Sequence, residues 1–540
     1  MHRFLLIYLA LAASLYSLGD SKPNIVFILA DDLGIGDVNC YGGERCLIDT
    51  PNIDQLAAGG LRFTDAHVPA SVCAPTRVAI MTGQYRWRTN RYQRGGPWGF
   101  TGLLFDPSQS FTLGDLFNEA GYHSGYVGKW HLGTLMSTKD GEIQGETNVD
   151  YHQPLKIGPV EFGFDYSFIL PGSLDMYPYA YARNNVWQGE VTAKKGWSAF
   201  NRVGDAEKDF EDHEVLETFY SEAEAFIDRQ TEDEPFFLYL ALTAPHTPTS
   251  PGVDWKGKSD LGVYGDFVME VDHSVERVLK ALKRNGLYEN TLVLFSSDHG
   301  PASYAGNILK ATPGQVHLME NKGHYPSGPH RGYKFSVYEG GIRVPLVAHW
   351  PKVIAPGTVS NALVGLNDLM ATFADIAGIE MDPEQGVDSV SFAPILRRQN
   401  ISTVRKNLIM QSVLEVFAVR DGDWKLCLGP GSGARGIHGN RPASDDAWRE
   451  ALAAFGKNPT REDLIRAPFV QLFDLGVDPQ EDRNLASLHP ERVNKMVALL
   501  KAQIEQGRST PGPSVIHDKS VKIHQRLPDF VVEQLAGTDK

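Results

Sequence analysis

Cysteine is scarce in this chain of 540 residues, which contains only Cys40, Cys46, Cys73 and Cys427. So few thiols exclude a small fold stapled by many disulfides, although a bridge between Cys40 and Cys46 would close a small loop. Low-complexity runs and internal repeats are missing, and a hydrophobic fraction of 42% is typical of a globular protein. This length exceeds one ordinary core, so we expect a large domain and a smaller one.

Positive charge is also in short supply, because the net charge is -15. A nucleic-acid partner requires the neutralisation of many phosphates, so this acidity argues against one. It does not exclude a small anionic ligand, since a single pocket can be positive on an acidic protein.

Apolar runs long enough to span a membrane are missing as well. The N-terminus reads His2-Arg3, an apolar run over Phe4–Tyr16, and small residues ending near Gly19. This order predicts a secretory signal peptide over residues 1–19, and the run is too short for a comfortable transmembrane helix. No cysteine follows it, so a bacterial lipoprotein anchor is not indicated. We therefore expect export to a periplasmic, extracellular or lysosome-like compartment, without a membrane span.

Strand and helix patterns alternate over residues 22–400. Short apolar runs bounded by turn residues predict buried strands at 24–30, 122–127, 235–242 and 291–295. Helical patterns predict helices at 53–60, 112–121, 215–229, 267–287 and 369–378. This alternation predicts an α/β domain with a mixed, mainly parallel sheet between helices. Residues 134–212, rich in Gly, Tyr and Asn, are expected to form irregular surface loops.

A change of composition near residues 395–405 marks a predicted domain boundary. Beyond it, Phe417–Leu426 carries a polar turn between two apolar segments and predicts a hairpin. A further strand at 471–475 and a helix at 491–506 complete a small α+β domain with an antiparallel sheet. We place this domain at residues 401–512 and a tail at 513–540.

Polar side chains follow four predicted strands at their ends: Asp31-Asp32, Lys129 with His131, His246, and Asp298-His299. In open α/β sheets, ligands bind outside the carboxyl ends of the strands, so these groups are expected to converge. Lys129 and His131, two positions apart, share one side of an extended segment. A lysine offers a point charge for an anion, and a histidine moves a proton near neutral pH. Each residue alone is more typical of a surface charge or a loop histidine.

The aspartates in this set predict a metal site. Asp31, Asp32 and Asp298 supply hard oxygen ligands, which suit Ca²⁺ or Mg²⁺ better than zinc. The alternative for the adjacent pair alone is that it caps a turn after a strand. His299 either adds a nitrogen ligand or hydrogen-bonds the anion.

The stretch Ser71–Gly83 predicts an anion site around Cys73. Pro75 is tolerated in a first helical turn, which places Cys73 at a helix N-terminus where free N–H groups attract anions. Arg77, one turn later, projects toward the same anion. The alternative is an inert buried cysteine beside a helix start. Combined with the metal, the histidines, Lys129 and Lys334, the set suits a tetrahedral oxyanion ester, with a histidine protonating the leaving oxygen.

Cys73-Ala-Pro-Thr-Arg77, followed by Thr82-Gly83, resembles the signature of type I sulfatases, a family with the alkaline-phosphatase-like fold. The resemblance extends from Pro23 to about Gly512. It implies that Cys73 is oxidised by a maturation enzyme to Cα-formylglycine, whose hydrate is the nucleophile. One hydroxyl attacks sulfur, and the other expels sulfate as the aldehyde re-forms. Thr76 departs from the serine usual in the signature.

The resemblance also implies roles for the remaining motif residues. One calcium ion per chain is held by Asp31, Asp32, Cys73, Asp298 and His299, the last being asparagine in many members. Arg77 matches the arginine that stabilises the hydrate. Lys129 and His131 fall on a Gly-Lys-Trp-His motif, His246 falls on Ala-Pro-His-Thr-Pro, and Lys334 matches a lysine that contacts sulfate.

The substrate is expected to be a sulfated carbohydrate, cleaved by exo action. Phe162–Tyr177 loosely resembles exported sulfatases that act on galactose or N-acetylgalactosamine 6-sulfates. With the loop 301–333 it supplies Asp175, Tyr177 and His330 as candidate sugar contacts. Ordinary loop packing is the alternative. Two other functions stay open: a phosphoester or phosphonate hydrolase of the same superfamily, and a sulfated-glycan binding protein that never acquires formylglycine.

Overall fold

The computed structural model describes residues 22–88, 102–196, 202–305, 315–398, 403–429, 431–434, 470–517 and 521–523. The expected signal peptide and most of the expected tail lie outside these residues. Within the described part of the chain, no helix is long and apolar enough to cross a membrane. All four cysteines are free thiols, so the possible bridge between Cys40 and Cys46 is not formed.

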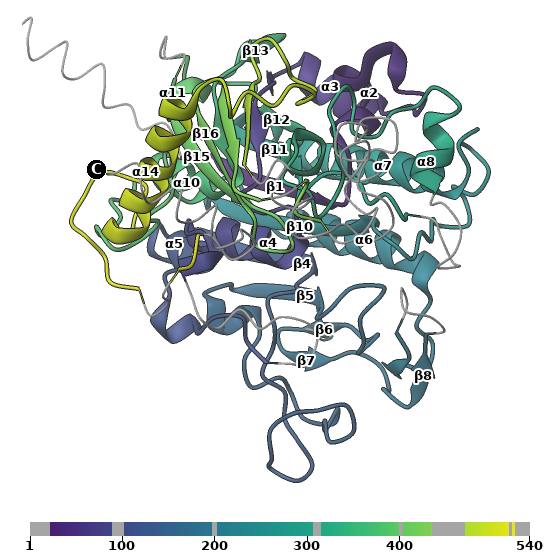
Figure 1. Cartoon of the computed structure of the whole chain (residues 1–540). Coiled ribbons are helices and arrows are strands. Elements are labelled where there is room, and N and C mark those ends of the chain that lie inside the picture. Colours follow the sequence, from purple (N-terminus) through teal and green to yellow (C-terminus); the bar gives the residue numbers. More distant parts are fainter. Residues whose placement is uncertain are drawn as a thin grey trace, which may run out of the picture.

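A ten-stranded sheet forms the centre of the molecule, in the order β13-β2-β12-β11-β1-β10-β4-β5-β6-β7 (Figure 1). Its middle strands run parallel and are β11 (Thr291–Ser297), β1 (Asn24–Asp31), β10 (Phe236–Pro245), β4 (His123–Lys129) and β5 (Tyr166–Leu170). The flanking strands are β12 (Leu346–His349), β2 (Leu61–Phe63), β13 (Thr358–Ser360), β6 (Ala182–Arg183) and β7 (Val186–Trp187). Most flanking pairs are antiparallel, which confirms the mixed, mainly parallel α/β sheet.

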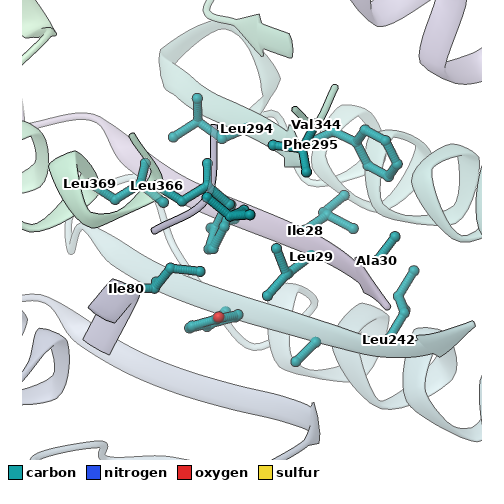
Figure 2. Packing of buried hydrophobic residues seen from close by; sticks show 14 of the residues in the cluster. Ile28, Leu29, Ala30, Ile80, Leu242, Leu294, Phe295, Val344, Leu366 and Leu369 are labelled. Atoms are coloured by element: carbon teal, nitrogen blue, oxygen red, sulfur yellow. The ribbon is translucent and has the colours of Figure 1, made fainter. Parts of the chain in front are cut away.

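Helices cover both faces of the sheet because successive strand residues point to opposite faces. Phe236 of β10 meets Phe226 of α6 (Val215–Ile227), and Phe237 stacks on Phe117 of α5 (Leu113–Glu119) on the other face. Further helices are α3 (Pro51–Ala58), α4 (Cys73–Thr82), α7 (Val263–Arg284) and α10 (Leu369–Ala377). Figure 2 shows the resulting core, with Ile28 and Leu29 of β1 among side chains of neighbouring elements.

A separate four-stranded antiparallel sheet follows, as the hairpin pattern predicted. Its strands are β15 (Asn407–Gln411), β16 (Phe417–Asp421), β17 (Trp424–Cys427) and β18 (Gln471–Asp474), with α14 (Pro490–Gln506) after them. The end of β15 joins the segment before Cys73, because Ser71 N–H donates to Gln411 O at 3.0 Å. The exact domain limits, 22–400 and 401–512, stay predictions.

The expectation of irregular loops over 134–212 is wrong in part. β5 adds a parallel strand to the main sheet, and β6, β7, β8 (Ala193–Lys195) and β9 (Gly204–Ala206) form hairpins beyond it. The apolar run of β5 is only a few residues long and lies among glycines and tyrosines, so its pattern is weak. The loop 301–333 likewise contains a short helix, α8 (Gln315–Glu320).

Candidate active site

The four strand ends singled out in the sequence lie side by side. β11, β1, β10 and β4 are consecutive parallel neighbours, so their carboxyl ends meet at one edge of the sheet. Asp32 and His131 both have positive φ values, 66° and 54°, and turn the chain sharply after β1 and β4. The expected extended backbone is therefore wrong at His131, although Lys129 still acts on the pKa of His131 within the same site.

Cys73 is the first residue of α4, after extended Val72, as the Pro75 pattern predicted. Its Sγ lies 3.2 Å from His299 Nε2 and 3.6 Å from Lys334 Nζ. Burial raises the pKa of the Cys73 thiol well above its ordinary value, even though Lys129 and Lys334 act in the opposite direction. An unmodified thiol here is protonated, and a protonated thiol is a weak nucleophile.

Three buried carboxylates surround Cys73, and each lies beside at least one cation. Lys129 Nζ lies 2.5 Å from Asp31 Oδ2, and Lys334 Nζ lies 2.7 Å from Asp32 Oδ1. Arg77 Nη2 donates to Asp298 Oδ2 at 3.1 Å. We call Asp31, Asp32, Cys73, Asp298 and His299, together with Arg77, Lys129 and Lys334, the cysteine cluster.

The carboxylates of this cluster are not fully compensated. Burial, reinforced by Asp31 and Asp298, raises the pKa of Asp32 to about 8. Burial and Asp31 raise the pKa of Asp298 to about 7. Burial acts on Asp31 too, but Lys129, His246 and Arg77 together hold its pKa well below the ordinary value. Like charges held this close favour a further cation among them.

The donor set fits a divalent metal ion. Asp31, Asp32, Cys73, Asp298 and His299 each offer one ligand atom, and these atoms lie within 4.8 Å of one another. Asp31 Oδ1 is buried and has no hydrogen-bond partner. His299 Nδ1 lies 2.9 Å from Gly300 O, so Nδ1 carries the proton and leaves Nε2 free to coordinate. Three carboxylates with one imidazole suit a hard cation such as calcium.

Two further imidazoles lie beside the cluster. His246 Nε2 is 3.8 Å from Asp32 Oδ2, and its Nδ1 donates to Thr247 O at 2.5 Å. Burial, followed by Lys334, lowers the pKa of His246 well below its ordinary value. Burial and Lys129 do the same to His131. Both imidazoles are therefore neutral before an anion binds.

The three candidate sugar contacts are placed differently. Asp175 bonds Arg202 Nη1 at 2.9 Å through Oδ2, while its Oδ1 is buried without a hydrogen-bond partner. Lys129 and Lys334 act on the pKa of Asp175, which burial nevertheless raises, so Asp175 borders the cluster. The ring of Tyr177 packs on Gly204, where an added Cβ would lie 1.8 Å from Tyr177 Cγ.

His330 has its contacts elsewhere. Its Nδ1 lies 3.3 Å from Pro479 O, beyond β18, and burial and Arg343 lower its pKa to about 3. His330 was predicted as a sugar contact because it lies in the loop 301–333, but this contact joins it to the segment beyond β18.

Sequence reasoning missed two tyrosines at the site. Tyr304 stacks on Phe335, and its ring centroid lies 5.8 Å from Lys334 Nζ. Tyr126 donates to Lys129 O at 2.7 Å, next to Arg77 Nη1, which donates to the same oxygen at 3.2 Å. Tyr304 lies in a loop without periodicity, and Tyr126 reads as an ordinary strand residue, so neither carried a local signal.

Comparisons with known proteins agree with this arrangement. A family model described as sulfatase matches residues 23–379. Arylsulfatase A of Homo sapiens is 33% identical over 538 residues, covering 94% of this chain and 92% of that protein. N-acetylgalactosamine-6-O-sulfatase of Bacteroides thetaiotaomicron is 29% identical over 518 residues, covering 89% and 93%.

A solved structure shares the fold. It comes from work on the metabolism of multiple glycosaminoglycans by Bacteroides thetaiotaomicron, has a TM-score of 0.73 at 28% identity, and covers 89% of this chain and 99% of its own. Since the family model spans more than half of the chain and arylsulfatase A aligns along almost all of it, this chain belongs to the sulfatase family of hydrolases, with the alkaline-phosphatase-like fold.

Proposed function

We propose that this protein hydrolyses sulfate monoesters of carbohydrates and releases inorganic sulfate. The observation that carries the proposal is the cysteine cluster, in which one cysteine, three carboxylates and three cations converge on a buried point at the strand ends. Membership of the sulfatase family supports sulfate as the anion. The name of the Bacteroides thetaiotaomicron relative, N-acetylgalactosamine-6-O-sulfatase, supports a sugar substrate.

In the proposed reaction, bound calcium supplies Lewis acidity toward the sulfate, and formylglycine made from Cys73 by a maturation enzyme supplies a hydrated nucleophile. Asp31, Asp32, Asp298 and His299 hold the metal. Arg77 holds the side chain at position 73 through its fixed place beside Asp298 and Lys129 O.

The lysines and histidines handle the charge and the proton. Lys129 and Lys334 bind the sulfate oxygens and stabilise the charge that develops on them. Nε2 of His246 faces the cluster and protonates the leaving oxygen, since the bound anion raises the pKa of a neutral imidazole. His131 is the second imidazole within the site. Asp175, through its unpartnered Oδ1, accepts a hydrogen bond from a sugar hydroxyl, and Tyr177 lines the same pocket.

Paired substrates test the chemistry. The protein, produced with its maturation enzyme, is assayed on an aryl sulfate and on the matching aryl phosphate. We expect kcat/KM to favour the sulfate by at least about 100-fold. A site whose charges complement the transition state of sulfate transfer stabilises the more highly charged transition state of phosphate transfer less well. A preference for the phosphate contradicts the proposal and favours a phosphoester hydrolase of the same superfamily.

The sugar and the modification need separate measurements. A panel of sulfated monosaccharides is expected to show fastest release from the 6-sulfates of galactose or N-acetylgalactosamine. Mass analysis of the peptide that carries Cys73 is expected to show formylglycine. An unmodified thiol throughout, in protein from the native host, supports a glycan-binding protein instead.

A further inference from the structure

The residue after Lys334 has a strained backbone that is held from two sides. Phe335 has a φ of 79°, which a bulky side chain rarely adopts. Its N–H donates to Ser71 O at 2.8 Å, two residues before Cys73, and its C=O accepts the N–H of Val413 at 3.2 Å. Val413 lies between β15 and β16. The backbone beside Lys334 is therefore clamped between the cysteine segment and the small antiparallel sheet.

A buried ionic group ties down the other end of this segment. Glu339 begins the short helix α9 (Glu339–Ile342), five positions after Lys334. Its Oε1 lies 2.9 Å from Lys425 Nζ of β17, and its Oε2 lies 2.9 Å from His67 Nε2. Arg343 Nε donates to Oε2 at 2.7 Å. These charges attach the segment to the small sheet at a second place.

Glu481, beyond β18, closes the group. Its Oε2 accepts the Glu339 N–H at 2.7 Å, and its Oε1 lies 2.7 Å from Lys425 Nζ. We call His67, Glu339, Arg343, Lys425 and Glu481 the anchor cluster. The side chains of Lys425, Glu339 and Glu481 are wholly buried. Burial acts against ionisation of Glu339, but Lys425, His67 and Arg343 hold its pKa well below the ordinary value.

We propose that Lys425 and Glu481 are positioning residues for Lys334. Through Glu339 and the Phe335 clamp, the small sheet fixes where Lys334 Nζ stands relative to position 73. Neither residue has a contact with the cysteine cluster, so their effect passes through the segment from Lys334 to Arg343. A buried charge group of this kind permits one arrangement, and displacement of a binding group by about 1 Å costs up to about 100-fold in rate. The inference rests on the proposed role of Lys334 in binding sulfate.

A charge-balanced double variant, Lys425→Met with Glu481→Gln, tests the proposal without leaving a buried charge unpaired. The measurements are kcat and KM on an aryl sulfate, and the inhibition constant of inorganic sulfate. We expect kcat/KM to fall by about tenfold or more and the inhibition constant of sulfate to rise by about fivefold, because Lys334 is misplaced.

A matched control removes another buried ion pair, which joins the segment just before β15 to the large domain. Arg405 Nη2 lies 2.6 Å from Asp368 Oδ1, and neither residue contacts the Lys334 segment. The control variant, Arg405→Met with Asp368→Asn, is expected to lower Tm comparably and to leave the inhibition constant of sulfate unchanged. Unchanged kcat/KM and sulfate inhibition in the test variant, or equal losses in both variants, overturn the proposal.

A second variant covers the case in which the double variant does not fold. Glu481→Gln alone keeps an oxygen for the Glu339 N–H and removes one of the two carboxylates that face Lys425. We expect the inhibition constant of sulfate to rise by about threefold, and an unchanged value in folded protein overturns the proposal. Failure of the proposed function looks different, because the unaltered protein then shows no sulfatase activity at all.

Discussion

The cysteine cluster and the anchor cluster are built from the same kinds of residue and are both buried, yet their charges are balanced differently. In the anchor cluster, Glu339 contacts Lys425, Arg343 and His67, and its pKa is held low, whereas burial and Glu339 raise the pKa of Glu481. In the cysteine cluster, Asp32 and Asp298 contact one cation each, and burial with neighbouring carboxylates raises their pKa values to about 8 and about 7.

This difference shows that burial of charge does not by itself identify a functional site. Two groups in the described part of the chain offer three or more potential ligand residues close together: five residues of the cysteine cluster, and Asp65 with His67 and Glu339 of the anchor cluster. Both clusters hold a buried atom without a hydrogen-bond partner, Asp31 Oδ1 in one and His67 Nδ1 in the other, so what separates them is the convergence of five potential ligand atoms around Cys73. We therefore expect the cysteine cluster to bind a metal and an anion, and the anchor cluster to serve the structure.

Loss of the nucleophile is the largest effect expected in the cysteine cluster. Cys73→Ala removes the precursor of formylglycine and is expected to lower kcat/KM on an aryl sulfate by about 10⁴-fold or more. Cys73→Ser can accept sulfate but lacks the second hydroxyl that expels it, so the sulfated enzyme is expected to accumulate. Intact-protein mass measurement after incubation with substrate detects it. Full steady-state turnover by Cys73→Ser excludes the mechanism.

Replacing one carboxylate by an amide in each cluster compares the two clusters through the free energy of unfolding. Glu339→Gln leaves Lys425 and Arg343 undercompensated and is expected to lower the free energy of unfolding by about 3–5 kcal/mol. Asp32→Asn in metal-free protein at pH 7 is expected to raise it by up to about 4 kcal/mol, because a carboxyl group with a pKa of about 8 in the folded protein must take up a proton on folding at that pH. Urea unfolding of both variants measures the contrast. Equal losses break the distinction between the clusters.

Metal removal is expected to affect one cluster only. Chelation of calcium is expected to abolish activity and to lower the free energy of unfolding by about 2–3 kcal/mol, the stabilisation that a ligand gives at about 100 times its Kd. Added calcium restores both quantities. Glu339→Gln keeps this response to calcium, whereas Asp31→Asn loses it. An unaltered protein whose Tm and activity ignore the chelator contradicts the calcium proposal.

The sequence predicted the cysteine cluster well because its parts are local to strand ends. Asp31, Lys129, His246 and Asp298 each follow an apolar run, and the geometry of a parallel sheet brings such ends together without further information. No sequence pattern predicted the anchor cluster. Lys425 lies in a predicted hairpin and Glu481 in a predicted loop, and both contact Glu339 only through tertiary packing. His330 was misplaced for the same reason, since its neighbour Pro479 is remote in sequence.

Glu270 of α7 is a buried carboxyl group outside both clusters, and its substitution has the smallest expected effect on stability. Its Oε2 accepts the Gly252 N–H at 2.8 Å, its Oε1 has no hydrogen-bond partner, and burial with Glu217 raises its pKa to about 7. Because the folded pKa exceeds the unfolded one, the stability that this group contributes is full below about pH 4.5 and declines as pH rises through about 7. Glu270→Gln is therefore expected to gain about 2 kcal/mol relative to the unaltered protein between pH 4.5 and 8.

Glu276→Gln on the same helix is the matched control for this prediction. The side-chain hydrogen bond from Lys280 lowers the pKa of Glu276, so that substitution is expected to lose stability as pH rises instead of gaining it. Urea unfolding at several pH values gives both slopes. Parallel slopes for the two variants mean that burial without a neighbouring cation does not raise the pKa of Glu270. The raised pKa values in the cysteine cluster are then no evidence that a cation is missing there either.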